Sequence, residues 1–348
     1  MARFERVRFD AAQWAQALAA SPDRIPHQSP AYLGFLAEDQ RGQPVIAALK
    51  AGDEVLGYFT GLIVKKFGFK ILGSPFRGWS TPYMGFNLRA EVPRRMAVEA
   101  LSDFAFKDLG CIHVEVTDSH VSVEDIEGLG FGHEVHATII NDLTLSEETL
   151  FNNMNSYRRR DIRRGEKHGV VIEEAKDSAF ADEFAAQFRD VFAKQGMVPH
   201  FGAERVRTLM KHFGPTGGLL MLRARAPGGE CVATGVYIGL EPAAFYWAGA
   251  SWRQHQHLHP NELLQWHAMR YWKARGMKTY NLAGTMDFKR RFGGAESSTL
   301  MIFKSKYRFL SRLRSRALPI HWAILRLKRR LASAADKGPP PGPREETG

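Results

Sequence analysis

Apolar residues follow the period of β-strands in two pairs of neighbouring segments. Residues 44–50 and 54–64 are rich in apolar residues, and a turn containing glycine lies between them. Residues 219–225 and 231–240 repeat the same arrangement around a second glycine-containing turn. Apolar strand-like runs that flank such a turn predict a β-hairpin. The sequence therefore predicts two similar hairpins, one in each half of the chain.

Helical periodicity occupies the segments around the hairpins. Helices are predicted at residues 11–20, 28–39, 93–109, 147–168, 178–194, 203–213 and 261–275. Two of these helices end at Gly110 and Gly276, and each glycine leads into a short apolar strand. Hairpin, helix, glycine and strand thus follow in the same order in both halves. We predict an α+β chain of two tandem domains, with mixed, mostly antiparallel sheets flanked by helices.

The positive charge is concentrated near the C-terminus. The chain has 48 basic and 37 acidic residues, but ten of the basic residues and none of the acidic ones fall between Leu300 and Arg330. The remaining 38 basic and 37 acidic residues nearly cancel, which is atypical of a uniformly basic nucleic-acid-binding protein. We expect an N-terminal domain over 1–142, a C-terminal domain over 143–305, a basic amphipathic helix over 306–331 and a disordered tail over 332–348.

The basic segment and the N-terminus bear on location. Leucine, isoleucine and tryptophan alternate with basic residues over 307–331, which predicts a helix at the surface of an anionic membrane; a helix packed on the body is the alternative. No run of 18 apolar residues occurs, and charges interrupt the N-terminal segment. Cys111 and Cys231 lie in strand-like contexts and are expected as buried thiols. We expect a cytoplasmic protein that can contact the inner membrane peripherally.

Residues 244–294 carry the most informative motifs. They include Asn261-Glu-Leu-Leu-Gln, a Tyr280-Asn-Leu-Ala-Gly segment, and Asp287-Phe-Lys-Arg-Arg-Phe-Gly-Gly294, while an arginine-rich segment lies upstream at 150–170. Over roughly residues 30–310 the chain resembles the FemAB-like peptidoglycan-bridge transferases, and equally the BioF2- or CelD-like acetyltransferases found beside polysaccharide-synthesis enzymes. The resemblance implies two tandem GNAT-like (acyl-CoA N-acyltransferase) domains, one active cleft, and transfer of an acyl or aminoacyl group to an amine.

The same resemblance places Phe288 and Lys289 along the channel between donor and acceptor. A lysine there could stabilise the oxyanion that forms when a thioester or ester is attacked; a solvated basic turn is the alternative. Two features depart from the family pattern. Asn281 stands where relatives often have aspartate, which removes one possible base. The loop 251–260 has no glycine to cradle a coenzyme A pyrophosphate, which favours another donor or binding by the other half.

Polar residues around that loop are further candidates. His255 is a candidate proton acceptor in the alternating set His255, His257 and His259. No cysteine or carboxylate pair accompanies the histidines, so we predict no metal site. Trp252 and Asn261 are expected to contact substrate.

Arginines crowd the predicted helix 147–168. Arg160, Arg163 and Arg164 share one face of this helix, since residues three and four apart are neighbours on a helix surface. Guanidinium groups bind phosphate through paired hydrogen bonds, so this face is a candidate phosphate site; a solvated helix surface is the alternative.

These observations predict an N-acyltransferase. The expected donor is acetyl-CoA or another acyl-CoA, and the expected acceptor is an amino group of a cell-envelope or polysaccharide precursor, either a small molecule or a lipid-linked amino sugar or peptide. Aminoacyl-tRNA as donor is one alternative. A catalytically inactive protein that binds envelope precursors as a scaffold is the other.

Overall fold

The computed structural model describes residues 2–66, 68–77, 79–193, 197, 199 and 201–307. Residues Met1–Lys304 form one compact unit, and a second unit begins at Ser305. The predicted amphipathic helix, apart from Lys306 and Tyr307, and the predicted tail therefore lie outside the described residues. Among the described helices, none combines the length and apolar character needed to cross a membrane.

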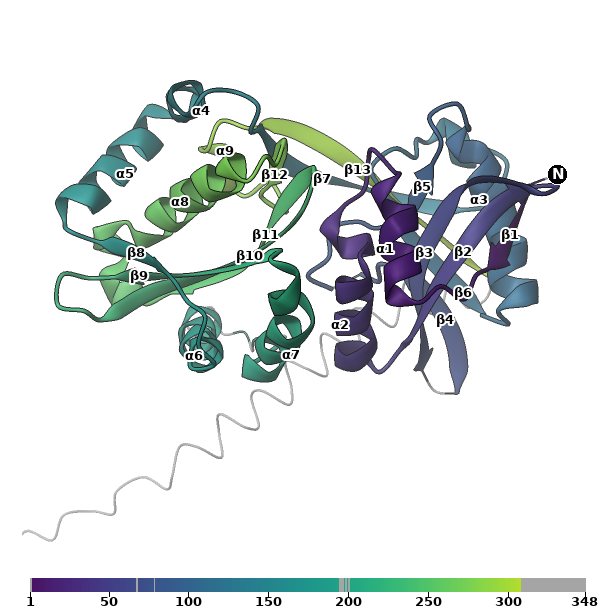
Figure 1. The fold of residues 1–348 in the computed structure, drawn as a ribbon, viewed down its shortest axis with the longest axis horizontal. Helices are drawn as coiled ribbons and strands as arrows, with labels where there is room; N and C mark the ends of the chain where they lie inside the picture. The colour runs from purple at the N-terminus through teal and green to yellow at the C-terminus, as the bar shows by residue number, and fades with distance from the viewer. Residues whose placement is uncertain are drawn as a thin grey trace, which may run out of the picture. The chain divides into compact units, whose positions relative to one another are not determined.

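The first half of the unit begins with a strand and two helices and continues as a meander (Figure 1). Its elements are β1 (Arg3–Arg6), α1 (Ala11–Ala19), α2 (Pro30–Gln40), β2 (Gln43–Ala51), β3 (Glu54–Lys66), β4 (Phe69–Ser74), β5 (Phe86–Leu88), α3 (Arg94–Asp103), β6 (His113–Asp118) and β7 (Gly132–Asp142). Ser29 begins α2 as its N-cap, with Pro30 in the first turn.

The second half repeats this order after two further helices. Its elements are α4 (Glu147–Asn153), α5 (Ser156–Lys167), β8 (Val171–Glu174), α6 (Phe180–Ala193), α7 (Ala203–Phe213), β9 (Leu219–Arg225), β10 (Cys231–Leu240), β11 (Ala243–Ser251), α8 (Pro260–Ala274), β12 (Thr279–Asn281), α9 (Asp287–Arg290) and β13 (Ala295–Ser305). A 3-10 helix over Arg253–Leu258 precedes α8.

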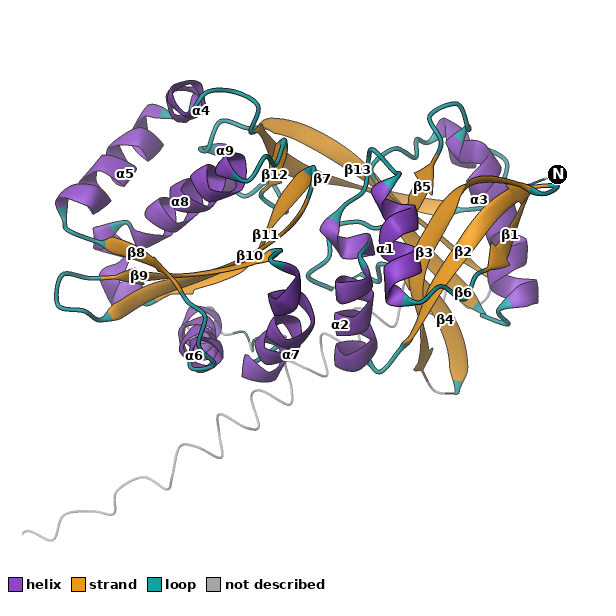
Figure 2. Cartoon of the chain, in the orientation of Figure 1, coloured by secondary structure: helices purple, strands orange, loops and turns teal. Residues whose placement is uncertain are grey.

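All of these strands belong to one sheet (Figure 2). The strand order is β1-β2-β3-β4-β6-β13-β7-β12-β11-β10-β9-β8, and β5 pairs with β3 off this path. Both predicted hairpins, β2–β3 and β9–β10, are antiparallel. Each half contains one parallel pair, β4–β6 in the first and β11–β12 in the second. The predicted α+β fold with mixed sheets and flanking helices is confirmed.

The last strand returns to the first half. β13 pairs with β7 from Ala295 opposite Ile140 to Phe303 opposite Gly132, and it also neighbours β6. Leu300 and Ile302 are buried in the same core cluster as the residues of β2, β3 and α3. Two strands, β7 and β13, therefore join the halves.

Helices cover both faces of the second half. α8 packs on β9 and β10 with α5 beside it, whereas α6 packs on β10 and β11 (Figure 1). α7 of the second half contacts α2 of the first, and one core cluster takes side chains from both.

Cys111 and Cys231 are both free thiols, and burial raises the pKa of each to about 11.

One predicted helix is two helices in the structure. The segment 147–168 was expected as continuous, but Met154 is extended and separates α4 from α5. The Asn155 side chain accepts a hydrogen bond from Tyr157 N and so begins α5 as its N-cap. The backbone N–H of Asn155 donates to Arg291 O. An N-capping side chain and a tertiary hydrogen bond thus break a segment whose periodicity is helical throughout.

Candidate active site

The parallel strands β11 and β12 diverge within the second half. They pair only from Ala243 opposite Thr279 to Phe245 opposite Asn281. β11 continues to Ser251 while its other edge stays paired with β10. The edge of β11 beyond Phe245 is therefore unpaired with β12, and a pocket of about 180 Å³ opens beside it.

Two glycines make room for this pocket. Gly235 of β10 lies directly opposite Gly249 of β11, and both line the pocket. A Cβ atom at Gly235 would lie 2.5 Å from the Tyr237 hydroxyl, and one at Gly249 would lie 2.6 Å from the Tyr246 hydroxyl. Glycine inside a strand often marks a close approach. Here it lets two phenol hydroxyls reach the pocket.

Both of these tyrosines are neutral. Burial raises the pKa of Tyr237 well above its ordinary value and also raises that of Tyr246. The Tyr237 hydroxyl is buried and has no hydrogen bond partner among the described residues. Neutral hydroxyls can donate and accept hydrogen bonds, but they do not act as bases at neutral pH.

The first turns of α8 close the pocket on the opposite side. The Asn261 side chain lines it and donates to the Ser251 hydroxyl at 2.8 Å. Gln265 also lines it and accepts a hydrogen bond from the Tyr280 hydroxyl through Oε1. Phe288 of α9 contributes an aromatic wall. Of the predicted site residues, the structure brings Asn261 and Phe288 to this pocket.

Lys289 is buried next to the pocket but does not line it. Only 8% of Lys289 is exposed, and its ammonium donates to Ala283 O at 2.6 Å. The ammonium lies 5.4 Å from the ring centroid of Tyr246, which lines the pocket. Burial lowers the pKa of Lys289 to about 8. A freely solvated basic turn does not describe this lysine, although its neighbours Arg290 and Arg291 are exposed.

Asn281 organises the turn that carries Lys289. Its side-chain oxygen accepts hydrogen bonds from Thr138 Oγ1 at 2.6 Å and from Ala283 N at 2.7 Å. Ala283 has a φ of 55°, a left-handed conformation that the side-chain bond helps to hold. The residue that replaces the family's aspartate therefore binds backbone and hydroxyl donors here.

The remaining predicted site residues lie outside the pocket lining. His255 interacts with Glu230, with 3.1 Å between Nε2 and Oε1. Trp252 is partly buried, and its backbone N–H donates to Val232 O. The predicted phosphate site, Arg160, Arg163 and Arg164, is exposed on α5.

Another arginine of the same helix is buried and links three helices. Arg158 of α5 is 2% exposed and forms an ion pair with Glu262 of α8. It also donates to Phe288 O at 3.0 Å. Its guanidinium lies 4.4 Å from the Phe288 ring centroid and 4.5 Å from that of Phe292. Arg158 therefore fixes the pocket wall against α8.

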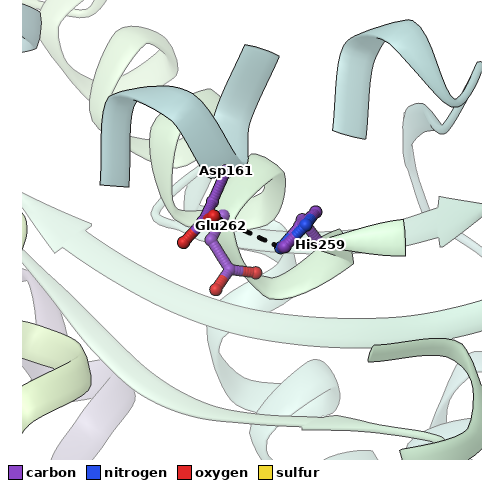
Figure 3. A group of neighbouring side chains, drawn as sticks. All are labelled: Asp161, His259 and Glu262. Carbon is purple, nitrogen blue, oxygen red and sulfur yellow. Dashed lines mark ion pairs between the residues drawn. The ribbon is translucent and has the colours of Figure 1, made fainter. Parts of the chain in front are cut away.

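Glu262 also belongs to a small group of titratable side chains (Figure 3). Asp161, His259 and Glu262 place one ligand-type atom each within 4.8 Å of the others, and 3.9 Å separates His259 Nδ1 from Asp161 Oδ1. The guanidinium of Arg158 already neutralises Glu262. The start of α8 thus carries a carboxylate, and Pro260 supplies no backbone N–H there.

Sequence reasoning missed Gly235, Gly249, Tyr237 and Gln265. One signal was available, since an isolated glycine in each of two apolar strands suggests a close approach. The sequence does not show that the two glycines lie opposite each other. Their pairing depends on the register of β10 and β11, and a β-bulge between Val236 and Tyr237 shifts that register.

Each half thus has a parallel strand pair joined through a helix, and the second half holds a pocket where that pair diverges. This arrangement defines a tandem GNAT fold, the fold of acyltransferases. Residues 153–290 match the family described as acetyltransferase (GNAT) domain. This match and the fold together indicate an acyltransferase.

Solved structures agree with this fold. A crystal structure of FemX has a TM-score of 0.69 and 15% identity, covering 85% of this chain and 96% of FemX. The C-terminal domain of a putative lysylphosphatidylglycerol synthetase from Agrobacterium fabrum has a TM-score of 0.52 and 12% identity, covering 83% and 92%. A tandem GNAT protein from the clavulanic acid biosynthesis pathway has a TM-score of 0.53 and 10% identity. The match covers 88% of this chain and 98% of that protein. At these identities the likeness establishes the fold. No curated protein matches the chain by sequence.

Proposed function

We propose that this protein transfers an acyl group from acetyl-CoA or another acyl-CoA to an amino group of a cell-envelope or polysaccharide precursor. The observation that carries the proposal is the pocket at the diverging β11–β12 pair of the GNAT domain. In this reaction the amine nitrogen attacks the thioester carbonyl, the C–S bond breaks, and the nitrogen loses a proton. A pocket that holds the carbonyl against the amine supplies proximity, which is a large part of the catalysis.

Lys289 is our candidate for stabilising the developing oxyanion. Its ammonium lies behind Tyr246, and a buried cation acts strongly because the surroundings screen it little. It would need to release Ala283 O or act through the Tyr246 hydroxyl. His255 stays a candidate proton acceptor, and Trp252 a candidate substrate contact.

The exposed face of α5 supports a phosphate-binding role. Arg160, Arg163, Arg164 and Lys167 recur at helical spacing, all four are exposed, and none has an ion pair within the described part of the chain. Tyr157 is 56% exposed, and the Arg160 guanidinium stacks 4.8 Å from its ring centroid. We propose that Arg160, Arg163 and Arg164 bind a phosphate of the donor or of a lipid-linked acceptor.

Aminoacyl-tRNA is the second candidate donor, and one observation favours it. The start of α8, where a coenzyme A pyrophosphate would need backbone N–H groups, carries Pro260 and the carboxylate of Glu262. The cation-rich face of α5 suits the phosphates of an RNA acceptor stem as well as those of a small donor.

Peripheral binding to an anionic membrane through residues 307–331, and a cytoplasmic location, remain predictions from the sequence.

Calorimetry with two titrants tests the proposal. Purified protein should bind acetyl-CoA saturably, and an Asn261→Leu variant, which removes the amide of a lining residue, should weaken this binding. A Lys278→Met variant, exposed and outside the pocket, should not. Binding of charged tRNA without binding of acetyl-CoA would shift the donor to aminoacyl-tRNA. Binding of neither, together with binding of an envelope precursor, would favour the inactive scaffold.

A further inference from the structure

The pocket offers hydrogen bonding without charge. Its polar lining groups include the hydroxyls of Tyr237 and Tyr246 and the side-chain amides of Asn261 and Gln265. None of the lining residues in the described part of the chain carries a charge. A ligand group that enters here can form hydrogen bonds, but a cationic group finds no carboxylate among the lining residues.

One of these polar groups has no hydrogen-bond partner among the described residues. The Tyr237 hydroxyl is fully buried and unpaired among them. Gln265 also lines the pocket, and its side-chain oxygen accepts a hydrogen bond from the Tyr280 hydroxyl. Buried polar groups are nearly always hydrogen-bonded, so an unpaired hydroxyl beside a pocket points to a ligand.

The pocket is also small. Its volume of about 180 Å³ lies below the roughly 300–1,000 Å³ of pockets that enclose drug-sized ligands. The glycine pair Gly235 and Gly249 sets this volume, because either Cβ would occupy the space beside a tyrosine hydroxyl. The pocket therefore holds the reacting end of a donor rather than a long chain.

We infer that this pocket selects a short acyl group that carries a hydroxyl or amide and no positive charge, with Tyr237 and Gln265 as its hydrogen-bonding partners and Gly235 and Gly249 as its size limit. The inference rests on the proposed acyl transfer and narrows its donor. A size-matched alkyl group would leave the Tyr237 hydroxyl unpaired, and an ammonium-bearing group would be buried without a counter-charge.

Truncated donors test this without assuming coenzyme A or tRNA. The probes are N-acetylcysteamine thioesters of glycolate, propionate, glycine and octanoate, titrated into the full chain by calorimetry. Glycolyl, propionyl and glycyl differ mainly in a terminal hydroxyl, methyl or ammonium. We expect glycolyl to bind about tenfold more tightly than propionyl or glycyl, in line with the loss of one hydrogen bond, and octanoyl not to bind.

Two variants assign the selectivity. Tyr237→Phe should make glycolyl and propionyl bind equally, without lowering the unfolding midpoint, because the lost hydroxyl has no partner among the described residues. Gly249→Ala should weaken glycolyl binding, whereas the matched Gly228→Ala, whose Cβ meets nothing within 4 Å, should not. Tyr271→Phe, a tyrosine outside the pocket lining, controls for tyrosine removal.

Equal binding of glycolyl and propionyl by the natural protein would overturn the inference. So would selectivity that survives Tyr237→Phe, or tightest binding of octanoyl. Acyl transfer measured in parallel separates the two proposals. Transfer without selectivity contradicts only this inference, whereas selective binding without transfer to any amine contradicts the proposed function.

Discussion

The two parallel strand pairs of this protein differ in how far the pairing extends along the strands. In the first half, β4 stays paired with β6 through Ser74, its last residue. In the second, β11 leaves β12 after Phe245. A Cβ on Gly73 of β4 would lie 2.4 Å from the Phe76 ring, whereas one on Gly249 of β11 would meet the Tyr246 hydroxyl beside the pocket. A ring therefore lies against the parallel pair of the first half, whereas in the second half the strand edge beyond the parallel pair borders a pocket.

Unpaired buried polar groups differ between the two regions in where they lie. Around β4 the Ser74 hydroxyl donates to Thr60 O and accepts from Gly85 N, and Asp118 accepts from Phe86 N and Val121 N. Among the described residues, both halves contain buried atoms without a hydrogen-bond partner, such as Thr60 Oγ1 and Asn87 Oδ1 in the first and the Tyr237 hydroxyl in the second. Tyr237 lines the pocket, whereas Thr60 and Asn87 do not. The comparison favours the second half as the one that binds a ligand.

The largest effect should come from removing the arginine that holds the open half together. Arg158→Ala leaves the carboxylate of Glu262 partly buried without its partner, so unfolding free energy should fall by about 3–5 kcal/mol. Urea denaturation measures this. Arg89→Ala, which breaks the exposed pair with Glu54 in the first half, should change it by less than about 1 kcal/mol. Equal effects would contradict the role assigned to Arg158.

Lys289→Met should lower kcat about 100-fold, because a cation close to the reacting carbonyl is lost. If the ammonium form acts, natural activity should fall as pH rises through about 8, the lowered pKa of Lys289. A pH–rate profile measures this, with exposed Lys278→Met as control.

Stability offers an independent check on the same lysine. Its folded-state pKa lies below the ordinary 10.5, so the unfolded chain binds more protons between the two values. Stability should therefore rise with pH from about 8 toward 10.5, and Lys289→Met should flatten this rise. A rise that persists in the variant would show that another group causes it.

A pair of glycine substitutions sharpens the comparison between the halves. Gly73→Ala should lower stability by about 1–3 kcal/mol, because its Cβ overlaps the Phe76 ring, and should leave the activity of the folded protein unchanged. Gly249→Ala should mainly lower kcat/KM, because its Cβ enters the pocket side of the sheet. Thermal unfolding and transfer assays separate the two effects. The reverse pattern would place the ligand in the first half.

The smallest effect concerns surface charge. Replacing Arg160, Arg163 and Arg164 together by alanine should change stability by less than about 0.5 kcal/mol, because all three are exposed. Binding of a phosphate-bearing donor should weaken about tenfold at low salt, and the difference should shrink as salt rises. The control replaces Arg77, Arg89 and Arg95 of the first half, which are ion-paired. Equal weakening would show a general charge effect.

The fold was largely predictable because it depends on local signals. The sequence shows the two hairpins, β2–β3 and β9–β10, and the glycines that end the helices before β6 and β12. These features locate the two similar halves of the chain. The pocket was only partly predictable. Phe288 and Asn261 came from motifs, but the pairing of Gly235 with Gly249 depends on a bulge, and the burial of Arg158 depends on contacts between helices far apart in the chain.

The return of β13 to the first half has a consequence for synthesis. Leu300 and Ile302 complete a core whose other buried residues lie before residue 130. A chain growing on the ribosome has therefore made almost all of the second half before the first can close its sheet. Contacts so distant in sequence form slowly. The halves should reach their final state together, and a truncation before Ala295 should leave open edges on both β6 and β7, the two neighbours of β13.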